Sequence, residues 1–234
     1  MSCPPRTGAT LVLEPALSPV SEPLAPGAQV FVGEGRRRRA GGIAAVLVLD
    51  GRLHLLTCGH LFPGAGSTIT SARAAGPIAE LRRNYLLEPD PLDAAVCELT
   101  REGVRLLAAS TSAPTWLRGH RAPRPDLDAA TAMFWPTHAA GSEPLRLTIS
   151  AHRAATIVLF PGGPHDGFIE VSSGVIPGDS GSLLAADDLY LGICSGQVQE
   201  RWSYFTPITD VLCRLCGDHQ EVTLWHPDDD FAAL

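Results

Sequence analysis

The chain has 234 residues, a formal net charge of -7, 45% hydrophobic residues and 18% charged residues. A chain of this length can form one large domain or two halves that share a core. The acidic balance argues against general nucleic-acid binding, and the lack of a basic-then-apolar start or an 18-residue apolar run argues against a signal peptide and a membrane span.

The residue usage favours many short strands over long helices. The chain contains 23 Gly and 20 Pro, which are typical of turns between strands. We therefore expect an all-β protein. Lysine is absent while arginine and alanine are frequent, a bias that indicates a GC-rich bacterial genome.

Residues 1–27 form a Pro-rich segment, within which 11–13 could add a strand. Residues 28–120 are expected to form the N-terminal half of the fold. Near its start lie four consecutive arginines, 36–39, which we interpret as a solvated loop. An anionic partner or a regulatory cleavage site is the alternative for these arginines.

The first candidate functional residue is His60. Two apolar runs, 43–49 and 53–56, flank Asp50-Gly51, which is a strong hairpin signal. His60 follows the second run after small residues, a position from which an imidazole can reach a cleft. The alternative is an ordinary surface or core histidine, of which the chain has 8 in all.

The second candidate is Asp93, which leads directly into the apolar run 94–97. Burying this carboxylate would be costly unless hydrogen-bond donors face it, and a histidine Nδ1–H is such a donor. Asp90 competes for the same role. We favour Asp93 because it adjoins the apolar run.

Residues 109–130 contain several prolines and are expected to form the segment that links the halves. The boundary is placed within this segment, and the C-terminal half is expected to span 121–234. Its strands are expected at 131–135, 145–149, 155–160, 168–171, 181–184, 189–194 and 204–207. Asp187-Asp188 should form a hairpin turn, and the apolar spacing at 209–215 predicts a closing helix. The segment 222–225 could add one more strand.

The third candidate is Ser180, within the sequence GDSG at 178–181. Glycines on both sides allow a tight turn and a close approach to a substrate carbonyl. The amides of Gly178 and Ser180 could then converge on an oxyanion. By itself the motif is also an ordinary turn sequence.

Together, TCGH (57–60), LDAAV (92–96), GDSG (178–181) and LGICSG (191–196) resemble the chymotrypsin/trypsin-like serine peptidases, of the bacterial cytoplasmic type. The resemblance covers about residues 28–215, and it implies two six-stranded antiparallel β-barrels with a short C-terminal helix. It also implies a serine endopeptidase in which Ser180 is the nucleophile, His60 the general base and Asp93 its orienting acid. Gly178 and Ser180 would form the oxyanion hole, and no metal or cofactor is implied.

The resemblance also places a substrate pocket at Gly174, Ser195 and Gly196. These residues are small and neutral, so we expect an uncharged P1 residue in a peptide or protein substrate. An acidic side chain from a distant loop, such as Glu200, is the alternative.

The chain departs from the secreted members of this family in its start. It has no processed N-terminus of the Ile-Val-Gly-Gly type to pair with Asp179. Asp179 must therefore find another partner, or the loop orders on substrate binding, and an activating protein partner is conceivable.

The cysteines depart as well. None is placed for the disulfide that flanks the catalytic histidine in secreted members, which favours a reduced, cytoplasmic protein. Cys213 and Cys216, followed by His219 and His226, raise a zinc site as an alternative that no second cysteine pair supports. A non-catalytic peptide-binding module and an esterase or self-processing maturation protease remain the other candidate functions.

Overall fold

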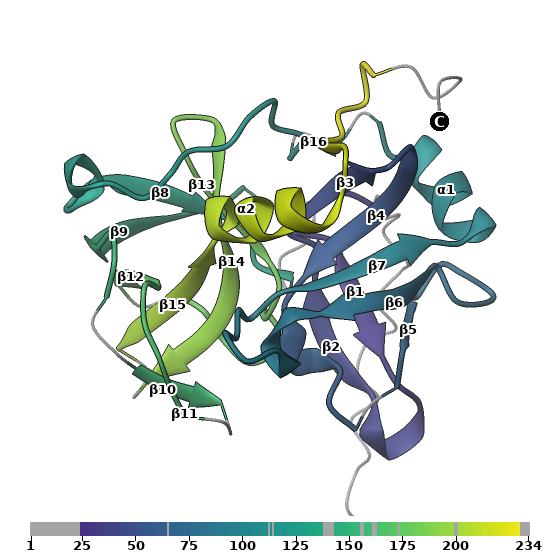
Figure 1. Ribbon diagram of the computed structural model, residues 1–234, viewed down its shortest axis with the longest axis horizontal. Coiled ribbons are helices and arrows are strands. Elements are labelled where there is room, and N and C mark those ends of the chain that lie inside the picture. Colours follow the sequence, from purple (N-terminus) through teal and green to yellow (C-terminus); the bar gives the residue numbers. More distant parts are fainter. Residues whose placement is uncertain are drawn as a thin grey trace, which may run out of the picture.

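The computed structural model describes residues 24–229 except 65, 112, 114, 138–142, 155–156, 161–162, 173 and 199–200. Two β-rich halves lie side by side, and a helix runs across one face of their junction (Figure 1). The all-β class is confirmed. The Pro-rich segment 1–23, with its suggested strand at 11–13, lies outside the described residues.

The N-terminal half is an antiparallel sheet of eight strands, in the order β16-β3-β4-β7-β6-β5-β1-β2. Its strands are β1 Gln29–Val32, β2 Arg39–Gly42, β3 Ala45–Leu49, β4 Arg52–Thr57, β5 Thr68–Thr70, β6 Ala79–Asn84, β7 Ala95–Leu99 and β16 Val222–Leu224. The sheet has two strands more than the six expected. One of the two is β16 in the tail, which pairs with β3, so the expected place of the tail in the C-terminal half is wrong.

The C-terminal half contains a closed antiparallel barrel of six strands, in the order β12-β15-β14-β13-β8-β9. These strands are β8 Thr131–Phe134, β9 Leu145–Ala151, β12 Ile169–Ser172, β13 Leu183–Ala186, β14 Leu189–Val198 and β15 Trp202–Pro207. The strands β10 Ile157–Phe160 and β11 Gly163–His165 form a separate hairpin.

Both expected hairpin turns are present, and both use left-handed backbone. Asp50 and Gly51 have φ of 47° and 75°, and Asp187 and Asp188 have φ of 51° and 58°. Two successive positive φ angles are typical of the type I′ turn, whose twist matches that of the flanking strands. The turns therefore fix the registers of β3 with β4 and of β13 with β14.

Two α-helices complete the described fold. Helix α2, Ile208–Asp218, matches the closing helix expected from the apolar spacing, and its buried face packs into the core of the N-terminal half. Helix α1, Arg101–Ala108, was not expected; the Thr100 hydroxyl caps it by accepting from Gly103 N–H at 3.2 Å. Short 3₁₀ turns lie at Gly35–Arg37 (η1), Gly59–Leu61 (η2), Tyr85–Leu87 (η3) and Pro125–Leu127 (η4).

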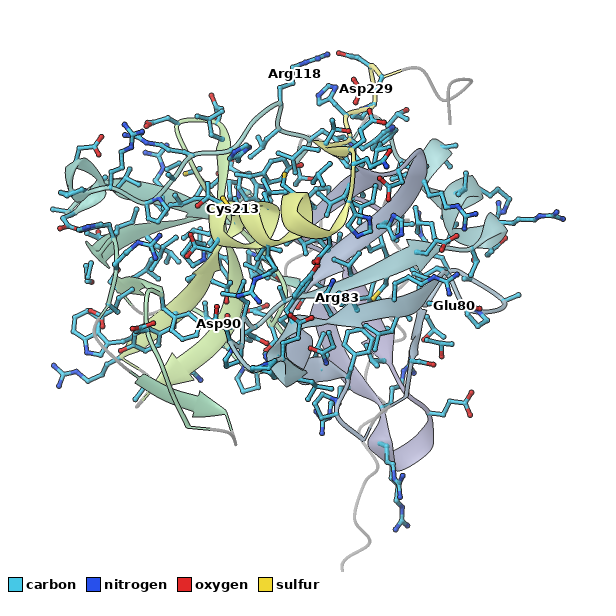
Figure 2. All side chains as sticks on the ribbon, in the orientation of Figure 1. Glu80, Arg83, Asp90, Arg118, Cys213 and Asp229 are labelled. Atoms are coloured by element: carbon cyan, nitrogen blue, oxygen red, sulfur yellow. The ribbon has the colours of Figure 1, made fainter. Side chains whose placement is uncertain are left out.

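Ion pairs tie α2 to the segment that leads into β7. Arg83 lies 2.5 Å from Glu88 and 2.6 Å from Asp218, and Arg214 contacts both Glu88 and Asp90. Figure 2 shows Arg83 and Asp90 at the junction between the halves, with Cys213 on α2 above them. Partly exposed pairs of this kind contribute little singly, about 0–1 kcal/mol each. As a network they hold the approach to Asp93 against the helix.

Candidate active site

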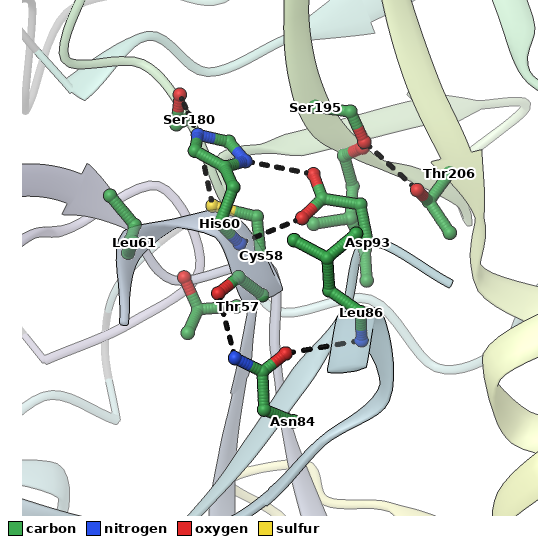
Figure 3. A network of polar contacts seen from close by, with 12 residues as sticks. Thr57, Cys58, His60, Leu61, Asn84, Leu86, Asp93, Ser180, Ser195 and Thr206 are labelled. Carbon is green, nitrogen blue, oxygen red and sulfur yellow. Dashed lines mark hydrogen bonds and ion pairs between the residues drawn. The ribbon is translucent and has the colours of Figure 1, made fainter. Parts of the chain in front are cut away.

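The structure brings His60, Asp93 and Ser180 together at the junction of the two halves (Figure 3). The ring of His60 lies between the other two residues: its Nδ1 is 2.9 Å from Asp93 Oδ2, and its Nε2 is 2.9 Å from Ser180 Oγ. The ring therefore connects a carboxylate with a hydroxyl through its two nitrogens.

Asp93 is only 2% exposed and carries two of the bonds that orient His60. Besides the ring contact, Oδ1 accepts a hydrogen bond from the backbone N–H of His60 at 2.9 Å. A buried carboxylate needs such donors to offset its lost hydration. The side chain of Asp90, the competing candidate, is 87% exposed and pairs with Arg214, so it does not face the ring.

His60 lies in the 3₁₀ turn η2, directly after β4 and Cys58. The amide of Asn84 supports this turn: its Nδ2 donates to Gly59 O at 3.0 Å, and its Oδ1 accepts from Leu86 N–H at 3.1 Å. A side chain at Gly59 would overlap Asn84, which explains the glycine. Asn84 was not among the expected site residues, because nothing in its local sequence pattern shows which turn it contacts.

Ser180 lies in a turn that is tied to both halves. Gly42 N–H on β2 donates to Ser180 O at 2.7 Å, and Gly181 N–H donates to Cys194 O on β14 at 2.7 Å. Gly181 has φ of 88°, and a Cβ there would overlap Thr57 Oγ1. The second glycine of GDSG is therefore required by conformation and by space.

The first glycine of that motif shapes the other side of the turn. Gly178 follows Pro177 and has φ of 103°, and Asp179 N–H donates to Ile176 O at 3.1 Å. Proline followed by a positive-φ glycine, closed by such a bond, is a type II turn. Within the described part of the chain, the amides of Gly178 and Ser180 donate to no other group.

Asp179 is fully buried, and the structure shows what holds it. Its Oδ1 accepts from Thr137 N–H at 2.8 Å and lies 3.0 Å from the Thr137 hydroxyl, and its Oδ2 accepts from Ile176 N–H at 3.1 Å. The Thr137 hydroxyl also lies 2.8 Å from Gly178 O. Thr137 thus connects the carboxylate with the Gly178 backbone, and no local pattern around Thr137 predicts this contact.

One buried thiol, that of Cys58, lies beside the ring, and a second buried thiol, that of Cys194, interacts with Cys58. Cys58 Sγ is 3.8 Å from His60 Nε2, and burial raises the pKa of Cys58 and of Cys194 well above that of a free thiol. Both therefore remain neutral at physiological pH. Cys58 and Cys194 therefore pack as small apolar side chains.

The three residues assigned to the pocket have different surroundings. Gly174 is half-buried, and a Cβ there would lie 2.7 Å from Leu147 Cδ2. Ser195 is 2% exposed, and its hydroxyl bonds to Thr206 Oγ1 at 2.8 Å. Gly196 has φ of 144° and open space where a side chain would be. Glu200, the alternative source of charge, lies outside the described residues.

The residues of the alternative zinc site contact different parts of the protein. Cys213 and Cys216 are exposed on α2, and His219 Nδ1 lies 2.8 Å from Asp50 Oδ2. Among the described residues, the group close enough to share an ion is Cys58, His60 and Asp93. Cys58 and Asp93 face opposite nitrogens of the His60 ring, so these atoms do not converge on one point.

The architecture and the placement of these residues define the chymotrypsin-like fold. No protein-family model and no curated protein sequence matches the chain. No helix in the described part of the chain is long and apolar enough to cross a membrane.

Solved structures of serine proteases share the fold. A glutamic-acid-specific serine protease has a TM-score of 0.62 and 16% identity, covering 86% of this chain and 100% of its own. Thermobifida fusca protease A has a TM-score of 0.61 and 14% identity, covering 87% and 98%. Cellulomonas bogoriensis chymotrypsin has a TM-score of 0.61 and 21% identity, covering 86% and 98%. At these identities the likeness establishes the fold, and the fold is the one that the resemblance implied.

Proposed function

We propose that this protein is a serine endopeptidase that works through a Ser180–His60–Asp93 triad. The observation that carries the proposal is the continuous contact from Asp93 Oδ2 through the His60 ring to Ser180 Oγ, with both distances at 2.9 Å. A serine hydroxyl is a poor nucleophile at neutral pH and needs an adjacent base, which His60 Nε2 supplies.

In the proposed reaction, His60 Nε2 takes the proton of Ser180 as Oγ bonds to the carbonyl carbon of the substrate. The C–N bond then breaks, and His60 returns the proton to the leaving amine. His60 Nε2 next takes a proton from water as the water oxygen bonds to the acyl carbon; the bond from that carbon to Ser180 Oγ breaks, and His60 returns the proton to Oγ. Asp93 holds the ring with its Nδ1 proton toward the carboxylate and stabilises the imidazolium that forms between the two proton transfers.

We propose the amides of Gly178 and Ser180 as the oxyanion hole. Turns of types I and II differ by a flip of their central peptide, so the type II turn at 176–179 sets the direction of the Gly178 amide. The Thr137 hydroxyl supports this turn through Gly178 O. One oxyanion donor is commonly worth about 2.7–4 kcal/mol of transition-state stabilisation.

We further propose an uncharged P1 residue, with Gly174 and Gly196 giving the pocket small walls and Ser195 contributing through its backbone. The site of action proposed is the cytoplasm, since the five cysteines among the described residues carry free thiols and three of these are packed in the core. An activating partner stays a prediction.

The decisive experiment is labelling with a fluorophosphonate probe, which reacts only with an activated serine. The wild-type chain should be labelled and Ser180→Ala should not. Peptides with Leu or Phe at P1 should be cleaved faster than an Arg-P1 peptide. Absence of labelling in a folded wild-type chain would favour the peptide-binding module, and a mass shortened on expression only in the wild type would favour self-processing.

A further inference from the structure

The four arginines at 36–39 differ from most arginines of the chain. All four are exposed, and no carboxylate of the described residues pairs with them. Eight other arginines form such pairs: Arg52, Arg82, Arg83, Arg105, Arg118, Arg121, Arg153 and Arg214. In a chain with a net charge of -7, a turn whose four arginines pair with no carboxylate of the described residues is a site where negative charge can be received.

Arg39 places one of these cations beside the catalytic histidine. Its Nη1 donates to His60 O at 2.7 Å and lies 3.5 Å from Leu61 O. A guanidinium has five N–H donors, and these carbonyls engage only one of its nitrogens. Arg39 is therefore held next to His60 with donors to spare.

The strand that carries Arg39 runs along the nucleophile. β2 is the last strand of its sheet, and Gly42 at its end donates to Ser180 O. Gly41 has no room for a side chain, because a Cβ there would lie 2.8 Å from Ser180 O. Arg38 is stacked on the Phe31 ring at 3.7 Å, which fixes the turn before β2.

This arrangement places Arg39 on the part of the site that belongs to the N-terminal half. The pocket residues belong to the C-terminal half, so the acyl part of a substrate lies over that half. The leaving amine must reach His60 Nε2, and the residues that follow it then pass over η2 and β2 of the N-terminal half.

We infer that Arg39 recognises an acidic side chain within the first residues after the scissile bond. This inference rests on the proposed function and names a substrate class for it: peptides with Asp or Glu just C-terminal to the cut. The remaining arginines of the turn add to the positive potential without contacting the reacting atoms.

The test uses matched quenched peptides that differ only in Glu, Gln or Lys at the second residue after the cut. The wild type should cleave the Glu peptide at about fivefold higher kcat/KM than the Lys peptide, as expected for a partly exposed charge pair, and added salt should reduce the ratio. Arg39→Glu should reverse the order. Arg101→Glu, which makes the same change in charge on α1 at the outer side of the N-terminal sheet, should leave the ratio unchanged (Figure 1).

Equal rates for all three peptides in the wild type would overturn the inference. So would an Arg39→Glu variant that slows every peptide by the same factor, because that result would make Arg39 only a support for the His60 backbone.

A binding measurement separates this inference from the proposed chemistry. Fluorescence anisotropy with Ser180→Ala should show about fivefold tighter binding of the Glu peptide than of the Lys peptide, whether or not the wild type cuts either one. Equal binding of the Glu and Lys peptides, together with labelling of Ser180 in the wild type, would contradict the recognition of charge by Arg39. The proposal that the protein is a protease would be unaffected.

Discussion

Asp93 and Asp179 are both buried acids close to Ser180, but they are held in different ways. Asp93 contacts one residue, His60: it accepts a hydrogen bond from the backbone N–H of His60, and its other oxygen faces Nδ1 of the titratable ring. Asp179 accepts from the backbone amides of Thr137 and Ile176 and from the Thr137 hydroxyl. Asp93 is bound to a group that can change its charge, and the contacts of Asp179 include two backbone amides that define the shape of a turn.

In the proposed mechanism, the difference means that a buried acid near the nucleophile need not be the one that orients the base. A carboxylate that faces imidazole controls the tautomer and the charge of that ring. A carboxylate that faces peptide N–H groups controls a turn, here the turn that carries Gly178 and Ser180. Substitutions at the two places should therefore fail differently, the first in turnover and the second in stability.

The largest expected effect is that of Asp93→Asn on turnover. The amide oxygen can still accept from His60 N–H, so the fold should survive. The NH₂ group would face Nδ1 and drive the ring proton to Nε2, so that His60 could no longer accept from Ser180. We expect kcat to fall by roughly 10⁴-fold, measured with a peptide substrate.

Asp90→Asn is the matched control, since it makes the same change on the exposed acid three residues earlier. Its kcat should stay near that of the wild type. If both variants lost activity equally, the division of roles between the two acids of this segment would be wrong.

A smaller effect is expected on the Asp179 side, from Thr137→Val. The backbone N–H of Thr137 remains, but the hydroxyl next to Gly178 O and Asp179 Oδ1 is lost. Because Thr137 is only 3% exposed, the free energy of unfolding should fall by about 1–3 kcal/mol in urea titrations. Activity should fall as well, as the turn loses a support.

Thr137→Ser keeps the hydroxyl and should recover most of both losses. A Thr137→Val variant as stable as the wild type would show that Asp179 is held without the Thr137 hydroxyl, and the contrast between the two acids would then rest on the ring of His60.

The sequence predicted the residues that the structure brings together because each ends a strong local pattern. His60 follows a hairpin, Asp93 begins an apolar strand, and Ser180 lies between glycines. It could not predict Thr137, Asn84 or the role of Arg39. Each contacts its partner 21 to 42 residues away in the chain, and no short pattern records that pairing. The strand suggested at 222–225 was placed in the wrong half for the same reason, since β16 joins β3 of the N-terminal sheet from the far end of the chain.

The smallest effect concerns His54, a third buried polar group, which lies on β4 of the sheet that carries His60. Burial lowers the pKa of His54 below its usual 6.5, and its Nδ1 lies 3.0 Å from Arg52 O. Below pH 6.5 the unfolded chain binds a proton at His54 more readily than the folded chain does. The stability that the neutral, buried His54 contributes is therefore complete above pH 6.5, and it is lost as the pH falls through the pKa of the folded state. Urea titrations between pH 7.5 and pH 5.5, endpoints set at roughly one unit on either side of that reference value, should show a flatter decline for His54→Gln than for the wild type. Parallel curves would mean that His54 gains its proton as easily in the fold as in the unfolded chain, and that burial alone does not exclude charge from this sheet.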